Sequence, residues 1–300
     1  MEAQDNHIQT EKRRFQLNEH PWLSLLAVLV TYLVSIILAG NVIFGVIGLP
    51  GDSPVVALAL LTSYHVMTVL VVVPFVLRLP KGRRTFRQYL DDIGLTRVQP
   101  FFRLVLLTLS CYLILALSQV AASFVYRLFE GLPVNWSFVQ QAFDLSSVLP
   151  SSSPSLYISL PSIFEEMAFR GVVLTGFLSR YPERKSIIFS ALGFGLWHLP
   201  FIVNQDPVWT LCQVVWAFII GLFYGYVAVK TRSLLPSMII HYLSNVFISF
   251  LSGYMQARAS IEIQALYGVI LSIGVVPTTL MILWARFFTS RWLPSDANRG

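Results

Sequence analysis

Charged residues are scarce in this chain of 300 residues. Asp, Glu, Lys and Arg together make up 12% of it, where a soluble domain has about 25%. Hydrophobic residues make up 55%, and the mean hydropathy is +0.67. Because this small number of charged residues cannot cover that much apolar surface in water, the composition excludes a soluble globular domain. It also excludes a disordered chain and a collagen-like repeat.

Cysteine is equally rare, with Cys111 and Cys212 as the two examples, each inside an apolar run. No C-x-x-C pair occurs, so neither a disulfide scaffold nor a thiolate metal site is expected. A cleavable signal peptide is not expected either. The first apolar run follows a polar stretch, Met1 to His20, and is too long for a signal-peptide core.

Long apolar runs dominate the rest of the chain. A helix crosses the hydrocarbon core of a bilayer in about 20 residues. Runs of that length predict eight transmembrane helices, at 22–46, 55–78, 104–126, 156–179, 185–204, 207–229, 234–255 and 264–286. The sequence therefore predicts an all-α, polytopic membrane helix bundle.

The basic residues indicate how this bundle is oriented. Nearly all of the 21 Lys and Arg fall in the two tails and in every second loop. The positive-inside rule then places both termini in the cytoplasm. We expect the membrane to be the plasma membrane of a prokaryotic cell. We interpret the net charge of +6 as a topology signal and expect no nucleic-acid partner. The basic loop 79–103 is expected to carry a short amphipathic helix, Arg84 to Ile93, at the interface. No repeat or linker divides residues 1–300, so a single membrane domain is predicted.

Few ionisable groups lie inside the predicted spans. Of 15 acidic residues only Glu165 and Glu166 do so, and Arg170 is the one basic residue well inside a span. The histidines His65, His198 and His241 also lie at membrane depth. Charges in the bilayer cost about 2.5–3.5 kcal/mol each on insertion scales, so these groups predict a functional site.

Helix geometry sorts these groups into pairs. Residues four apart share a helix face, which pairs Glu166 with Arg170, Phe194 with His198, and His241 with Asn245. Glu165 is rotated by about 100° from Glu166. Pro161 and Pro200 are expected to break backbone hydrogen bonds close to these groups, at Tyr157 and Leu196 respectively.

Three motifs stand in order along the chain: E-E-x-x-x-R from Glu165, F-x-x-x-H from Phe194 to His198, and H-x-x-x-N from His241 to Asn245. Together they resemble the CPBP family of intramembrane glutamate proteases, which includes the Ras-converting CAAX endoproteases. The resemblance covers roughly 155–250, which we take as the catalytic core. Eight membrane helices is also the usual arrangement of that family.

The resemblance implies roles for the paired carboxylates and the first imidazole. Glu165 corresponds to the catalytic glutamate, a general base for water, and His198 helps to orient and activate that water. Glu166 corresponds to a second, supporting glutamate, with Arg170 as its ion-pair partner.

The remaining motif residues correspond to groups around the reacting carbonyl. His241 and Asn245 resemble the pair that stabilises the oxyanion, and Phe194 shapes the pocket. The resemblance implies a membrane-associated substrate, either a prenylated CAAX-type C-terminus or a peptide precursor. No cofactor or bound metal is expected.

Other interpretations of these residues stay open at this point. Two histidines, a glutamate and an asparagine also suit a zinc-dependent membrane hydrolase, although H-E-x-x-H is absent. The buried charges also fit a non-catalytic scaffold, an immunity protein or an ion-coupled transporter. His65 lies outside the motifs and is expected to be a hydrogen-bonded core histidine. Gly221-x-x-x-Gly225 is expected to allow close helix packing.

Overall fold

The computed structural model describes residues 20–41, 62–63, 65–76, 85–129, 131, 133–137, 140, 159–203, 207–256 and 274–293. No strand occurs in these residues, which confirms the all-α fold class. The main elements are α1 (Pro21–Gly40), the π-helix η3 (Met67–Val72), α3 (Val73–Val76), α4 (Phe86–Asp92), α5 (Phe101–Phe129), α8 (Pro161–Glu166), the π-helix η6 (Met167–Val173), α9 (Leu174–Leu178), α10 (Glu183–Leu196), the 3-10 helix η7 (Leu199–Val203), α11 (Pro207–Thr231), α12 (Leu235–Gln256) and α14 (Val276–Trp292).

Each of the eight predicted apolar ranges overlaps at least one of these helices. Within the described part of the chain, three helical stretches are long and apolar enough to cross a membrane: 101–118, 183–202 and 210–231. The count of eight spans and the side of the termini stay predictions. Residues 1–19, 42–61, 257–273 and 294–300, on which both depend, lie outside the described part of the chain.

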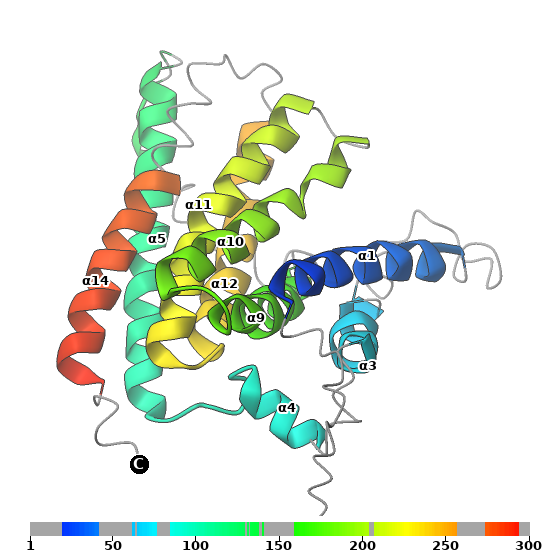
Figure 1. The fold of residues 1–300 in the computed structure, drawn as a ribbon. Helices are drawn as coiled ribbons and strands as arrows, with labels where there is room; N and C mark the ends of the chain where they lie inside the picture. The colour runs from blue at the N-terminus through cyan, green and yellow to red at the C-terminus, as the bar shows by residue number, and fades with distance from the viewer. Residues whose placement is uncertain are drawn as a thin grey trace, which may run out of the picture.

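The helices form one bundle with a flanking arm (Figure 1). Helix α5 packs against α12 and α14, and α11 packs against α10 and α14. Helix α1 extends away from this bundle, and its first half packs against η6 and α9. The segment η3–α3 packs against α1, and α1 in turn packs against η6, which continues the helix that carries the two glutamates.

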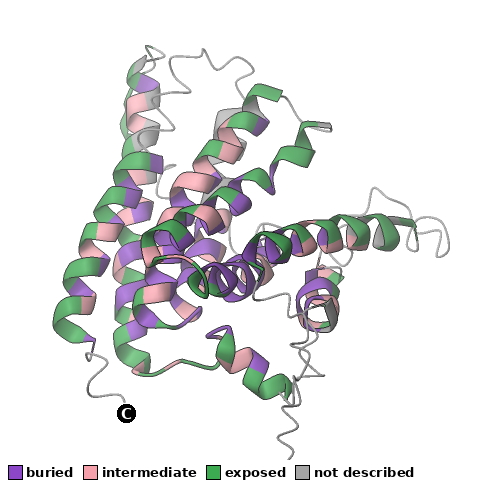
Figure 2. Ribbon diagram, viewed as in Figure 1, coloured by how far each residue is buried: buried purple, intermediate pink, exposed green. Residues whose placement is uncertain are grey.

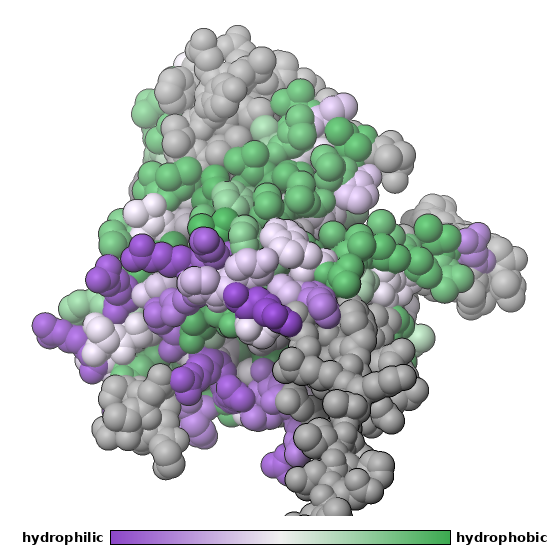
Figure 3. All heavy atoms as spheres, in the orientation of Figure 1, coloured by the Kyte–Doolittle hydropathy of each residue, from purple (hydrophilic) through white to green (hydrophobic). Residues whose placement is uncertain are grey.

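The outward faces of the bundle are apolar. Leu26 and Ile37 of α1 and Leu106 and Leu113 of α5 are all more than half exposed. Figure 2 shows these exposed faces around a buried centre, and Figure 3 shows the apolar surface beside a polar belt. A continuous apolar surface is unfavourable in water but is what a lipid-facing helix presents.

The helix that carries the glutamates begins later than predicted. The sequence places it at 156–179 with Pro161 as an internal break, but Ser159 and Leu160 form a turn and α8 begins at Pro161. Proline is favoured in the first helical turn because its fixed φ suits the helix and its missing N–H has no intrahelical partner there. Pro161 therefore starts the helix and does not interrupt it, and the predicted break at Tyr157 lies outside the described residues.

The predicted helix 185–204 is divided near its histidine. Helix α10 ends at Leu196, a turn follows at Trp197 and His198, and η7 continues from Leu199 to Val203. Pro200 has no N–H and its ring would clash with the carbonyl of Leu196 in a continuous helix. His198 consequently lies at a helix end.

The predicted amphipathic helix of the basic loop is present as α4. Thr85 caps it: its hydroxyl accepts from the Gln88 N–H at 3.2 Å, and the Gln88 side chain accepts from the Thr85 N–H at 2.8 Å. Just after α4, Ile93 packs on Gly171 of η6, where a Cβ atom would lie 2.9 Å from the Ile93 Cβ. The absence of a side chain at Gly171 thus allows α4 to dock on the bundle.

A backbone contact fixes the residues that follow α4. The Leu234 N–H donates to the carbonyl of Gly94 at 3.1 Å. Gly94 has a φ of 83°, and Arg232, in the turn after α11, has a φ of 54°. A Cβ on Gly94 would lie 3.1 Å from the Arg232 carbonyl oxygen. The α4–α5 loop and the α11–α12 turn are therefore held against each other.

Lowering the pH should loosen the α4–α5 loop through Asp91. Its carboxylate accepts from Arg97 Nη2 at 3.2 Å and from the Thr96 hydroxyl at 2.8 Å, and these bonds lower its pKa below the ordinary 3.8. A lowered folded-state pKa adds stability above the unfolded-state pKa, and this is lost as the pH falls through the folded value. We expect the thermal midpoint of Asp91→Asn to fall less than that of wild type between about pH 5 and pH 2. The effect is small because Asp91 is exposed. Parallel melting curves for the two proteins over this range would contradict the assignment.

Candidate active site

Three segments of the bundle bring the motif residues together. Helix α8 carries Glu165 and Glu166, the end of α10 carries Phe194 and the turn with His198, and α12 carries His241 and Asn245. Helix α12 packs directly on α8. The Phe194 ring contacts both imidazoles edge-on, with centroids 5.1 Å from His198 and 5.5 Å from His241. The phenylalanine therefore forms a wall between the two histidines.

The predicted Glu166–Arg170 pair is present and fully buried. Arg170 Nη1 lies 3.0 Å from Glu166 Oε1, and neither side chain is exposed. His241 Nδ1 approaches the same oxygen at 2.9 Å. One carboxylate oxygen thus joins α8, η6 and α12, and the charge of Glu166 is paired within the protein.

Arg170 is held from several sides. Its Nη2 donates to the Gly221 carbonyl at 3.3 Å, and its guanidinium lies 4.2 Å from the Phe194 ring centroid and 5.2 Å from that of Tyr224. A Cβ on Gly221 would lie 3.1 Å from that Nη2 atom. The predicted packing glycine therefore also makes room for the guanidinium.

Glu165 is the more accessible carboxylate, with 14% of its side chain exposed. It lies between two imidazoles: Oε1 is 3.7 Å from His65 Nε2, and Oε2 is 3.8 Å from His241 Nε2. These distances are longer than hydrogen bonds. The two glutamates therefore approach opposite nitrogens of His241. Glu166 is in close contact with Nδ1, and Glu165 lies farther away, on the side of Nε2.

The backbone fixes the orientation of His198. Its Nδ1 lies 3.0 Å from the Phe194 carbonyl oxygen. A carbonyl accepts only, so Nδ1 carries the proton and Nε2 of the neutral ring is an acceptor. Asn245 lies one helical turn after His241 and is half-buried. The contacts above connect six of the predicted residues into one cluster: Glu165, Glu166, Arg170, Phe194, His198 and His241.

His65 belongs to this site, although the motifs do not include it. It is 2% exposed and hydrogen-bonded to the hydroxyl of Tyr32 from α1, as expected of a core histidine. The structure adds its approach to Glu165. The Tyr32 ring also contacts Trp197 edge-on, which connects α1 to the turn that carries His198. In the sequence, the predicted membrane depth of His65 is the one feature that indicates a role in the site, because a third histidine inside the membrane is energetically costly.

Metal-ligand geometry is not evident around these groups. Among the residues that the structure describes, no three His, Cys, Asp or Glu side chains are placed to hold one ion. The cluster offers instead a paired, buried carboxylate beside a second carboxylate flanked by imidazoles. Such an arrangement suits proton transfer to and from a water molecule.

The fold and the cluster define a helical membrane protein with paired carboxylates and histidines at its centre. Residues 154–247 match the family described as Rce1-like, type II CAAX prenyl endopeptidase Rce1-like. This segment belongs to the CPBP family of CAAX proteases, as the motifs indicate. It contains every motif residue and nearly coincides with the predicted core at 155–250. No curated protein matches the chain.

Proposed function

We propose that this protein is an intramembrane endopeptidase in which Glu165 activates water to hydrolyse a peptide bond. The observation that carries the proposal is the division between the two glutamates. Glu166 is buried and paired with Arg170, whereas Glu165 is partly accessible and flanked by two imidazoles. We therefore assign a structural role to Glu166 and the reaction with water to Glu165.

In the proposed reaction, water attacks the carbonyl carbon of the scissile bond while its proton passes to Glu165. Collapse of the tetrahedral intermediate breaks the C–N bond, and the same proton passes to the leaving nitrogen. His198 Nε2, an acceptor in the neutral ring, helps to orient the attacking water. The intermediate has a negative oxygen, and in this proposal His241 and Asn245 stabilise it as hydrogen-bond donors.

The Glu166 contact sets a condition on His241. If Nδ1–H donates to Glu166, then Nε2 of the neutral ring has no proton to donate. His241 can stabilise an oxyanion from Nε2 only when both ring nitrogens carry protons. Glu166 thus fixes the ring and determines which nitrogen faces the reaction.

The proposed substrates are membrane-associated chains with a CAAX-type prenylated C-terminus, or peptide precursors. The family description names a prenyl endopeptidase, and the site lies within the helical bundle. We further propose that this is a multi-pass protein of a prokaryotic plasma membrane. We place both termini in the cytoplasm, because the basic residues lie almost entirely in the tails and alternate loops.

The test of this function is cleavage of defined peptides by the purified protein. Quenched fluorescent CAAX peptides, prenylated and unprenylated, are incubated with wild type, with and without a metal chelator. We expect cleavage of at least one prenylated peptide at the same rate in both conditions. Loss of activity with chelator and recovery with zinc would replace this mechanism by a zinc-dependent one. Binding without cleavage across the panel would favour a non-catalytic scaffold.

Substitution of His65 should lower the rate of cleavage without unfolding the protein. His65→Phe removes the polar neighbour of Glu165, and misplacement of the base by about 1 Å costs on the order of 10²-fold in kcat. His65→Gln retains a side chain that hydrogen-bonds and should keep most of the activity. KM should change little, because His65 acts through Glu165.

Tyr32→Phe is the comparison variant for His65→Phe, because the Tyr32 hydroxyl is hydrogen-bonded to the His65 ring. It removes the hydrogen bond to the ring and should give a smaller decrease in kcat than His65→Phe. Thermal melting checks that all three variants fold. Wild-type kcat in a folded His65→Phe variant would leave His65 with a packing role alone.

A further inference from the structure

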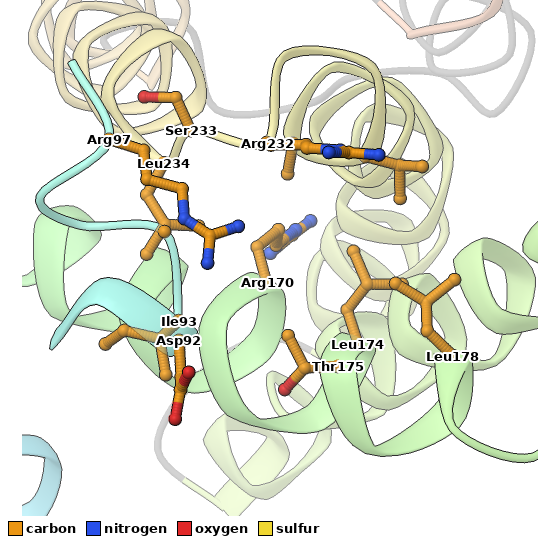
Figure 4. A pocket seen from close by; sticks show the side chains of 13 residues that line it. Asp92, Ile93, Arg97, Arg170, Leu174, Thr175, Leu178, Arg232, Ser233 and Leu234 are labelled. Atoms are coloured by element: carbon orange, nitrogen blue, oxygen red, sulfur yellow. The ribbon is translucent and has the colours of Figure 1, made fainter. Parts of the chain in front are cut away.

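Three arginines line one cavity at the polar end of the bundle. The cavity has a volume of about 220 Å³ and lies where the α4–α5 loop meets η6, α9 and the α11–α12 turn. Figure 4 shows Arg97, Arg170 and Arg232 around it, each from a different segment. Asp92 is the one acidic residue among the described residues that line it, and its carboxylate points away from Arg97 and Arg170.

Arg170 gives this cavity a connection to the buried cluster. Its guanidinium pairs with Glu166 through Nη1 and with Gly221 through Nη2. Its buried Nε has no hydrogen-bond partner among the described residues. The Arg170 guanidinium is thus enclosed by the cluster, and this residue lines the cavity without an exposed donor.

Arg97 is positioned by the loop that follows α4. Its Nη2 donates to Asp91 at 3.2 Å, and its side chain is 42% exposed. A guanidinium has five N–H donors in a planar fork, and this contact with Asp91 uses one of them. Arg97 faces Arg170 across the cavity (Figure 4). The Arg97 guanidinium thus points toward the part of the cavity wall that Arg170 forms.

Arg232 occupies a backbone position that favours glycine. It follows the end of α11 with a φ of 54°, the left-handed conformation that commonly ends a helix and that glycine adopts without strain. An arginine held there is disfavoured unless its side chain contributes something that glycine lacks. Its guanidinium lies beside the cavity.

We propose that this cavity binds a phosphate-bearing anion, either the headgroup of an anionic phospholipid or free phosphate. Guanidinium groups recognise phosphate oxygens through paired, charge-assisted hydrogen bonds, and the exposed Arg97 and Arg232 line this cavity together with the enclosed Arg170. The cavity volume of about 220 Å³ is large enough for a phosphate group. Arg97 and Arg232 lie outside the proposed peptidase cluster, and the test of this site needs no cleavable substrate.

The test measures ligand-induced thermal stabilisation of the purified full chain in detergent. The probes are short-chain phosphatidylglycerol, short-chain phosphatidylcholine as a neutral headgroup, and sodium phosphate against sodium chloride at equal ionic strength. We expect phosphatidylglycerol or phosphate to raise the melting temperature of wild type saturably. If phosphate alone gives the full shift and competes with the lipid, the ligand is free phosphate; if only phosphatidylglycerol does so, it is the headgroup.

The decisive variant is Arg232→Gly, which removes the guanidinium and relieves the backbone strain together. We expect its melting temperature without ligand to equal or exceed that of wild type, and its affinity for the anion to be at least about tenfold weaker. Arg97→Gln should also weaken binding. Arg184→Gln, at an exposed arginine of α10 outside the cavity, removes the same charge and should bind as wild type does.

Several results would overturn the proposal. These are equal weakening by Arg184→Gln and Arg232→Gly, equal stabilisation by the neutral and anionic lipids, or no stabilisation of wild type by either anion. Stabilisation by a peptide with a free C-terminal carboxylate, where neither phosphate probe has any effect, would assign the cavity to a peptide terminus instead.

Discussion

Glu165→Gln is expected to abolish peptide cleavage and to leave the fold intact. An amide cannot take a proton from water, so the rate should fall by about 10²- to 10⁴-fold, the typical contribution of a general base. The side chain is 14% exposed, and its oxygens lie 3.7 Å and 3.8 Å from the nearest imidazole nitrogens. The substitution keeps this shape and breaks no short hydrogen bond to those imidazoles. The melting temperature should therefore stay close to that of wild type.

The measurement is initial cleavage rate at saturating substrate, with thermal melting as the folding control. Glu183→Gln is the matched variant, since Glu183 forms a surface pair with Lys230 at 2.8 Å, away from the cluster. It should cleave as wild type does. A folded Glu165→Gln protein with wild-type kcat would remove Glu165 from the role of base.

Arg170→Met is expected to destabilise the protein strongly. It leaves Glu166 buried with an uncompensated charge, and breaking a buried ion pair from one side costs about 3–5 kcal/mol. It also removes the bond to the Gly221 carbonyl and the contact with the Phe194 ring. The free energy of unfolding, measured in detergent with a denaturant, should fall by that amount.

A double variant separates charge from packing. Glu166→Gln with Arg170→Met leaves no buried charge in the pair, and much of the lost stability should return. The coupling energy from the double-mutant cycle should then be large. Lys230→Met breaks the exposed pair with Glu183 and should cost less than about 1 kcal/mol. Additive losses from the two single variants would show that Glu166 and Arg170 do not depend on each other.

Much of the site follows from spacing along single helices. Four-residue separation correctly places Arg170 against Glu166 and Phe194 against His198, because neighbours on one helix face are set by the helix itself. The helical fold follows from composition and from the length of the apolar runs. In each case the information is local to one segment.

Other features depend on how separate segments pack. His65 lies 100 residues before Glu165, and their approach depends on how η3 packs on α1 and how α1 packs on η6. The start of the helix at Pro161 depends on a choice between two allowed roles of proline, a kink or a first turn. The arginine-lined cavity needs the α4–α5 loop to dock on the α11–α12 turn, and no periodic pattern encodes that contact.

The two π-helices bear on which changes in chain length the protein can tolerate. Met67–Val72 begins two residues after His65, and Met167–Val173 begins directly after Glu166. A π-helical turn contains one residue more than an α-helical turn. If Met167–Val173 became a regular α-helix with the same number of residues, the two glutamates would thus turn by roughly 100° relative to Leu174–Leu178, and deleting one residue at the same time would restore most of their direction. The helical phase at this point sets the direction of both carboxylates, so the number of residues here matters as much as their identity.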